Sequence, residues 1–335
     1  MFIVNSYSLA VILCFITMFC WGSWGNTQKL AAKNWRYELF YWDYVLGILF
    51  FSLLLGFTLG SHGIAGRGFV TDLKQVSGGN FWSAFAGGVI FNASNILLAA
   101  AISISGMSVA FPLGVGLALV LGVFINYFTA PKGDPWLLFI GVFAIMAAIV
   151  FNGIASGKMA SGGEKNTARK GLWIAISAGV LMSLFYRLVA SAMDLSDLAA
   201  PAAGKVTPYS AFFIFTLGIL ASNFLFNTLV MKKPFVGAPV TYGEYFRGSL
   251  KTHLVGVLGG LVWGIGTSLS YIAAGKAGAA ISYGLGQGAT MVAALWGVFI
   301  WKEFKGGTKA VNMLLALMFV LFTSGLILII FSGAN

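Results

Sequence analysis

The sequence is poor in the side chains that most enzymes use for chemistry. It holds nine Asp and Glu residues, two histidines and two cysteines in 335 positions. It also lacks the His-Glu-x-x-His zinc motif, the Gly-x-Ser-x-Gly turn of serine hydrolases and the Gly-x-x-x-x-Gly-Lys-[Ser/Thr] phosphate loop. These absences argue against a hydrolase, a metalloenzyme and an ATP-driven machine. We therefore expect a protein that is not an enzyme and that needs no metal and no cofactor.

Charged residues of both signs are rare as well. They make up 9% of the chain, hydrophobic residues make up 59%, and the mean hydropathy is +0.91. This balance leaves too little polar surface to coat a water-soluble globule. The composition therefore predicts that the lipid bilayer surrounds most of the chain.

Ten apolar stretches are long enough to cross a bilayer. A hydrocarbon core about 30 Å thick needs roughly 20 helical residues at about 1.5 Å each. The sequence predicts an all-α integral membrane protein with ten transmembrane helices. They lie at residues 7–24, 40–60, 81–103, 108–128, 136–155, 171–193, 209–231, 253–274, 278–301 and 311–331.

The basic residues predict an orientation. With Arg187 inside a span set aside, 14 Lys and Arg residues follow odd-numbered spans and 5 follow even-numbered ones. Because positive residues collect on the cytoplasmic side, we expect both termini to lie outside, or in the periplasm of a bacterial inner membrane. The basic residues are scattered over short loops, so we expect no nucleic-acid partner. The cytoplasmic set is Lys29, Lys33, Arg36, Lys158, Lys165, Arg169, Lys170, Lys232, Lys233, Arg247, Lys251, Lys302, Lys305 and Lys309.

A polar stretch divides the spans into two groups of five. Residues 156–170 predict a cytoplasmic linker between a first unit, 1–155, and a second, 171–335. Spans three and four resemble spans eight and nine at an offset of 172 residues, with Gly106 matching Gly278 and Gly122-Val-Phe-Ile matching Gly297-Val-Phe-Ile after a three-residue insertion. Units with an odd number of spans insert in opposite orientations, so the pattern predicts two inverted repeats. Chance likeness between glycine-rich packing segments is the alternative.

Three motifs carry a resemblance to a known family. They are Trp21-Gly-Ser-Trp-Gly-Asn-Thr-Gln-Lys29, Tyr41-Trp-Asp-Tyr44, and Gly284-Leu-Gly-Gln-Gly288 with Trp296-Gly-Val-Phe-Ile-Trp-Lys-Glu-Phe304. With ten spans in two halves, they resemble the drug/metabolite transporter superfamily, in its branch of ureide permeases and glucose or ribose porters. The short central loop resembles that of bacterial members of the branch.

The resemblance implies a transporter of a small neutral polar solute. Its members are similar to proton-coupled carriers of ureides and nucleobases such as allantoin and uracil, or of sugars, which work by alternating access. An exporter of metabolites or drugs is the alternative within the superfamily. A channel is the alternative from another class, because it would also line a path with amides and glycines.

Asp43 is the predicted site of proton coupling. It lies about 10 Å into the second span beside Tyr41, Trp42 and Tyr44, and an ionisable group inside a membrane is a functional hypothesis by default. The alternative is ordinary solvation in an aromatic belt at the interface. Glu38 lies closer to the cytoplasm, where we expect it to be solvated.

Amide and aromatic side chains inside the spans make up the predicted substrate site. Amides suit a neutral polar solute, and planar rings suit a flat one. Arg187 could hold a substrate oxygen with its forked donors or extend toward Asp194. For the amides, hydrogen bonding between helices is the alternative. The predicted substrate-binding residues are Trp21, Trp24, Asn26, Gln28, Asn92, Asn95, Phe111, Arg187, Tyr283 and Gln287.

Overall fold

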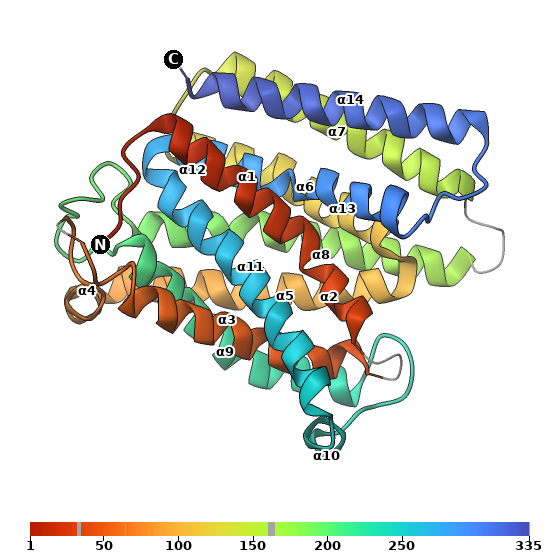
Figure 1. Ribbon diagram of the computed structural model, residues 1–335, viewed down its shortest axis with the longest axis horizontal. Helices are drawn as coiled ribbons and strands as arrows, with labels where there is room; N and C mark the ends of the chain where they lie inside the picture. Colours follow the sequence, from red (N-terminus) through yellow and green to blue (C-terminus); the bar gives the residue numbers. More distant parts are fainter. Residues whose placement is uncertain (32–34, 64, 160–164, 335) are drawn as a thin grey trace.

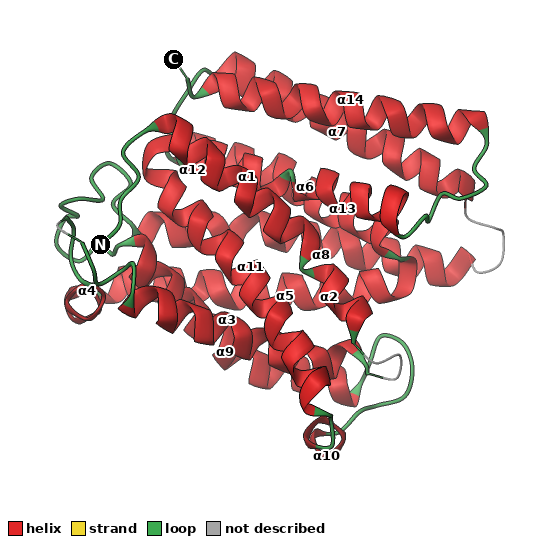
Figure 2. Ribbon diagram, in the orientation of Figure 1, coloured by secondary structure: helices red, strands yellow, loops and turns green. Residues whose placement is uncertain are grey.

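The computed structural model describes residues 1–31, 35–63, 65–159 and 165–334. These parts of the chain are built from helices, and they contain no β-strand beyond one isolated bridge between Met193 and Val206 (Figures 1 and 2). The expectation of an all-α protein is confirmed.

Ten helices of the described chain are long and apolar enough to cross a membrane, as predicted. The first is α1 (Tyr7–Ser23) continued by α2 (Gly25–Leu30), and the ninth is α12 (Ala279–Gln287) continued by α13 (Ala289–Leu295) and a π-helical turn, η1 (Trp296–Ile300). Two short helices, α4 (Phe69–Gln75) and α10 (Tyr242–Phe246), lie between spans. The other spans are α3 (Tyr37–Phe57), α5 (Gly78–Ser105), α6 (Met107–Thr129), α7 (Pro135–Met159), α8 (Lys165–Ala192), α9 (Pro208–Lys232), α11 (Leu250–Ala277) and α14 (Lys309–Ser332).

Several helices begin a turn before the apolar stretch that predicts them. Ser77 caps α5 by accepting a hydrogen bond from the Asn80 amide, and Ser249 caps α11 in the same way for Thr252. A polar first turn is therefore helical although it adds nothing to the hydropathy count. The same holds at the centre of the chain, where α7 extends to Met159 and α8 begins at Lys165. The predicted linker, 156–170, is thus partly helical; its residues 160–164, like Lys33, lie outside the described residues.

Close contacts at glycines set the helix packing. A Cβ on Gly88 of α5 would lie 1.9 Å from the carbonyl oxygen of Phe215 in α9, and a Cβ on Gly260 of α11 would lie 2.0 Å from that of Tyr44 in α3. Small residues of this kind let helix backbones approach inside a membrane. As a result, α5 packs on α8 and α9, and α11 packs on α1 and α3.

Helices α7 and α14 form a separate pair along one edge of the bundle (Figure 1). A Cβ on Gly141 would lie 2.7 Å from the Gly325 carbonyl oxygen, and a Cβ on Gly325 would lie 2.6 Å from that of Gly141. Large apolar side chains on the outer faces of the bundle are exposed, among them Trp136 and Phe143 on α7. These faces suit contact with lipid.

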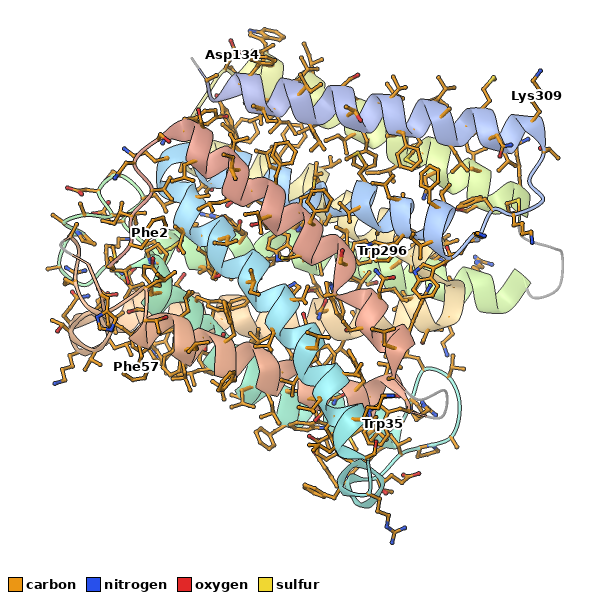
Figure 3. All side chains as sticks on the ribbon, in the orientation of Figure 1. Phe2, Trp35, Phe57, Asp134, Trp296 and Lys309 are labelled. Atoms are coloured by element: carbon orange, nitrogen blue, oxygen red, sulfur yellow. The ribbon has the colours of Figure 1, made fainter. Side chains whose placement is uncertain are left out.

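Both termini lie at one end of the bundle, together with α4 (Figure 1). We call this the termini end; α2 and α10 lie at the opposite end, the α10 end. Figure 3 places Phe2 and Asp134 at the termini end and Trp35 and Lys309 at the α10 end.

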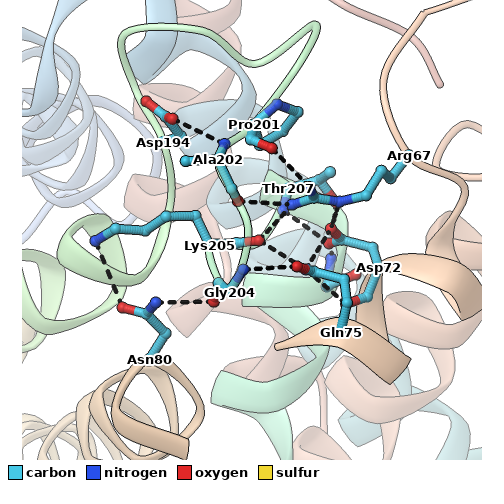
Figure 4. Close-up of polar contacts among 11 residues, drawn as sticks. Arg67, Asp72, Gln75, Asn80, Asp194, Pro201, Ala202, Gly204, Lys205 and Thr207 are labelled. Carbon is cyan, nitrogen blue, oxygen red and sulfur yellow. Dashed lines mark hydrogen bonds and ion pairs between the residues drawn. The ribbon is translucent and has the colours of Figure 1, made fainter. Parts of the chain in front are cut away.

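A network of polar contacts, the loop network of Arg67, Asp72, Gln75, Lys205 and Thr207, holds the termini end together (Figure 4). The buried carboxylate of Asp72 accepts hydrogen bonds from Arg67 Nε at 2.9 Å and from the Thr207 amide at 2.8 Å. Arg67 also donates to the Lys205 carbonyl, and Gln75 donates to the same oxygen at 2.8 Å. The network joins the segment before α4 to the segment before α9.

Candidate central cavity

A cavity with about 310 Å³ of empty space lies at the centre of the bundle. Its wall comes from α1, α5, α6, α8, α11, α12 and α13, with Trp24 at the joint between α1 and α2. The lining residues are Trp21, Trp24, Phe91, Asn95, Leu98, Phe111, Val115, Met182, Phe185, Trp263, Gln287 and Ala289. An apolar pocket with a few polar groups is typical of a small-molecule site. The side chains leave room here for about one water molecule, so the cavity has to widen to take a larger solute.

Two spans are irregular at the cavity. Trp24 lies between α1 and α2, and Gly288 lies between α12 and α13, next to the lining residues Gln287 and Ala289. A third irregularity, Pro112 inside α6, follows the lining residue Phe111. Trp24 and Gly288 keep right-handed helical dihedral angles, so both spans continue through these irregular points beside the cavity.

Stacked rings form one wall. The rings of Phe91 and Trp263 stack with centroids 4.3 Å apart, and Trp21 stacks on Trp263 at 6.3 Å and 12°. The Trp21 indole is fixed by a hydrogen bond from Nε1 to Thr267 Oγ1 at 2.9 Å. The wall therefore presents flat ring surfaces held in place by packing and one hydrogen bond. Residues 91 and 263 are separated by the same 172 positions as Gly106 and Gly278.

Two amides supply most of the polar character. Asn95 Nδ2 donates to the hydroxyls of Tyr41 at 3.1 Å and Tyr44 at 3.3 Å, and these two hydrogen bonds fix the orientation of the amide. Gln287 borders the cavity from the end of α12. An amide carries both donors and an acceptor, so the two side chains can match a solute with mixed hydrogen-bonding groups.

Five of the ten predicted substrate residues line this cavity: Trp21, Trp24, Asn95, Phe111 and Gln287. Tyr283 does not. It is buried one turn before Gln287, where its hydroxyl lies 3.2 Å from the Ala118 carbonyl oxygen and 3.1 Å from that of Met182.

Arg187 and Gln28 lie in two other pockets toward opposite ends. Arg187 is exposed and borders a pocket of about 290 Å³ at the termini end, the Arg187 pocket, with Asn126 and Thr129. Among the described residues it forms no ion pair with Asp194. Gln28 borders a pocket of about 550 Å³ at the α10 end, the Gln28 pocket.

The structure places Asn92 and Asn26 in contacts between helices. Asn92 Nδ2 donates to Ser222 Oγ of α9 at 2.9 Å. Asn26 Oδ1 accepts a hydrogen bond from Trp301 Nε1 at 2.7 Å. For both side chains, the geometry matches the alternative of hydrogen bonding between helices.

Asp43 is buried in a cluster at the α10 end, away from the central cavity. Its carboxylate accepts a hydrogen bond from Tyr245 Oη at 2.6 Å, and both its oxygens lie 2.9 Å from His253 Nδ1. Burial and the hydrogen bond to Asp43 raise the pKa of Tyr245, so its hydroxyl stays protonated and can donate. The predicted solvation of Glu38 is wrong: its side chain is fully buried and paired with Arg36. The pairing compensates the burial of the charge.

Sequence reasoning missed several residues of these sites. His253 and Tyr245 lie more than 200 positions from Asp43, and nothing local in the sequence links them. Phe91 and Trp263 could have been found, because the 172-residue offset relates them and both fall inside predicted spans.

Comparisons with known proteins agree with this picture. A family model described as Ureide permease matches residues 164–332, about half of the chain. Ureide permease 1 of Arabidopsis thaliana is 23% identical, with 96% of each chain covered, and Ureide permease 4 of the same plant is 22% identical over the whole of both. A putative sugar uptake protein of Lactococcus lactis, YxfA, is 24% identical and covers 95% of this chain and 97% of its own. One crystal structure shares the fold, with a TM-score of 0.59 at 16% identity over 96% of this chain and 98% of the other.

Proposed function

The chain belongs to the ureide permease family and is a multi-pass membrane transporter of small solutes, and on that premise we propose that it carries one neutral polar solute through the central cavity by alternating access. The solute is a ureide or nucleobase, such as allantoin or uracil, or a sugar. The names of the plant relatives favour a ureide, and the name of the Lactococcus relative favours a sugar.

One observation carries the proposal: the central cavity combines stacked rings with the two amides of Asn95 and Gln287. Ring faces hold a flat or carbon-rich solute without a charge requirement. The amides then select a solute with matching donors and acceptors, because a buried amide without a partner costs about 1–3 kcal/mol. Among the described residues that line the cavity there is no charged side chain, which suits a neutral solute.

Alternating access needs two closures, and we assign them to two tight contacts beside the cavity. Toward the Gln28 pocket, Trp24 packs on Tyr44 with ring centroids 4.8 Å apart. Next to the lining residue Phe185, Tyr186 Oη lies 3.0 Å from Ser270 Oγ and 3.3 Å from Ser282 Oγ. A carrier has to open two such closures in turn, whereas a channel opens both at once.

The proposed inverted repeat has support from matched features of the two halves. Gly106 joins α5 to α6 with φ 79°, and Gly278 joins α11 to α12 with φ 84°. In this left-handed region, glycine avoids the strain that a side chain would bring. The packing of α5 on α8 and α9 also parallels the packing of α11 on α1 and α3.

We further propose that inward transport is coupled to protons through Asp43 and that both termini face the outside. The support for coupling is a carboxylate that is buried inside a span and contacts an ionisable histidine. The support for the orientation is the excess of basic residues near the α10 end.

The test is uptake of radiolabelled allantoin, uracil, glucose and ribose by proteoliposomes with an imposed pH gradient. Uptake of one solute by the wild type, lost in Asp43→Asn, is the expected result. The variants Asn95→Leu and Gln287→Leu should raise the KM for that solute about tenfold, because each removes a hydrogen bond in a buried site. Asn312→Leu, the same change on an exposed position of α14, is the matched control.

Two results would contradict the proposal. If no solute is taken up but preloaded vesicles release one down an outward gradient, the protein is an exporter. If uptake shows no acceleration by the same solute on the opposite side of the membrane, the protein is a channel and the closures do not open in turn.

A further inference from the structure

Three elements meet at the carboxylate of Asp43. Asp43 belongs to α3, Tyr245 to α10 and His253 to the first turn of α11, and both partners contact the carboxylate within 3 Å. The two ends of the Asp43–His253 pair differ in their access to water: the Asp43 side chain is 3% exposed and the His253 side chain is 23% exposed. A proton that travels between water and Asp43 therefore meets the imidazole first.

We propose that His253 carries protons between water and Asp43, so that the coupling site is this pair of residues and not Asp43 alone. The inference rests on the proposed function, since it assigns a residue to the proton step of that transport.

The geometry permits a balanced transfer. With Nδ1 protonated, the neutral imidazole donates to an Asp43 oxygen. A proton from water binds Nε2 and forms an imidazolium, and the Nδ1 proton then passes to the carboxylate. The products are a neutral carboxyl and a neutral imidazole that carries its hydrogen on Nε2. The reverse sequence returns the proton, so no other reactant is needed.

The imidazole packs against neighbouring residues and keeps 23% of its side chain exposed. Nε2 faces the segment before α11, where a Cβ on Gly248 would lie 2.6 Å from it, and Trp35 meets the ring edge-on with centroids 5.4 Å apart. On the α11 side, a Cβ on Gly256 would lie 2.4 Å from Asp43 Cβ, so the two helices touch there.

In the described chain, the titratable groups that contact Asp43 are Tyr245 from α10 and His253 from α11. Within α3, Glu38 is paired with Arg36 instead. The raised pKa of Tyr245 keeps its hydroxyl out of the exchange.

Transfer of the proton converts an ion pair between α3 and α11 into two neutral groups. The electrostatic tie between these helices therefore weakens when Asp43 is protonated, which links proton binding to helix movement.

The test compares two activities of the same proteoliposomes. Exchange of solute across the membrane at equal pH needs no net proton movement, whereas accumulation driven by a pH gradient does. His253→Asn is the informative variant, because the amide nitrogen of asparagine can replace Nδ1 as a donor to Asp43 but cannot carry a proton. His253→Gln is the second variant, and His62→Gln, at an exposed loop position, is the matched control.

We expect His253→Asn to exchange solute within twofold of the wild type and to lose gradient-driven accumulation by at least tenfold, with loss of the solute-induced pH rise outside the vesicles. His62→Gln should keep both activities. Wild-type accumulation in His253→Asn would overturn the inference. Loss of exchange in a variant that elutes as a folded monodisperse protein would also overturn it, because the histidine would then be a structural donor. A wild type that neither exchanges nor accumulates any tested solute would instead refute the proposed function.

Discussion

The substitution Gly88→Ala tests the helix packing that surrounds the cavity. The added Cβ would lie 1.9 Å from the Phe215 carbonyl oxygen, whereas real Cβ contacts are essentially never closer than 3.0 Å. The backbones of α5 and α9 must therefore separate by roughly 1 Å, and overpacking of this kind costs about 1–3 kcal/mol. Because the obstacle is backbone, no side-chain rotation can relieve it.

The matched control is Gly153→Ala in α7, where an added Cβ meets nothing within 4 Å. In that exposed position, alanine should stabilise the helix by about 0.5–1 kcal/mol, since glycine is the poorer helix former. The two variants should therefore differ by about 1.5–4 kcal/mol, or on the order of 5–10 °C in melting temperature.

The assay is thermal unfolding of purified protein in detergent, followed by tryptophan fluorescence. Gly260→Ala, on the other side of the bundle, should behave like Gly88→Ala because its Cβ would lie 2.0 Å from the Tyr44 carbonyl oxygen. If Gly88→Ala melts at the same temperature as Gly153→Ala, then α5 and α9 are not in the close contact described. The described position of α5 in the cavity wall would then be wrong as well.

Three further predictions concern the loops and the cavity. Asp72→Ala should destabilise the protein by about 3 kcal/mol, because its donors in the loop network lose a buried carboxylate, while Asp197→Ala, at an exposed position, should change the melting temperature by less than about 2 °C. Hydrogen bonds, first from the Ser196 hydroxyl and then from the Ala202 backbone amide, lower the pKa of Asp194 from its ordinary value of 3.8. The charge of Asp194 therefore stabilises the fold above pH 3.8, and this stabilisation is lost as the pH falls through the lower pKa of the folded state. Asp194→Asn should have a lower melting temperature than the wild type at pH 7 and the same melting temperature at the most acidic pH. Trp21→Phe keeps a ring but loses the indole hydrogen bond, and we expect a roughly fivefold higher KM for the transported solute, measured by uptake.

The spans could be predicted because the bilayer makes apolar length a direct signal. The exact helix starts could not, because capped polar turns such as the one at Ser249 add no hydropathy. Glu38 shows the same limit in another form. Its position near a span end suggested solvation. The Arg36 guanidinium pairs with it instead, and the same guanidinium donates to carbonyl oxygens of the loop that follows α9. The pairing therefore depends on a loop that is distant in the sequence.

The cavity could be predicted in part. Asn95 and Gln287 stand out because amides are rare and costly in apolar spans, but depth along a helix does not say which way a side chain points. Asn92 lies three residues from Asn95 and bonds to α9 instead. The partnership of Asp43 with His253 depends on the contact between α3 and α11, which no local pattern encodes.

The α7–α14 pair offers a practical reference for measuring motion. Within the described chain, neither helix contributes a residue to the lining of the central cavity. Their reciprocal contact at Gly141 and Gly325 packs each closely against the other. A spin label on the exposed face of this pair would serve as a reference point outside the cavity wall. Distances from that point to labels on α3 and α11 would then report, in ångströms, which helices travel during the transport cycle.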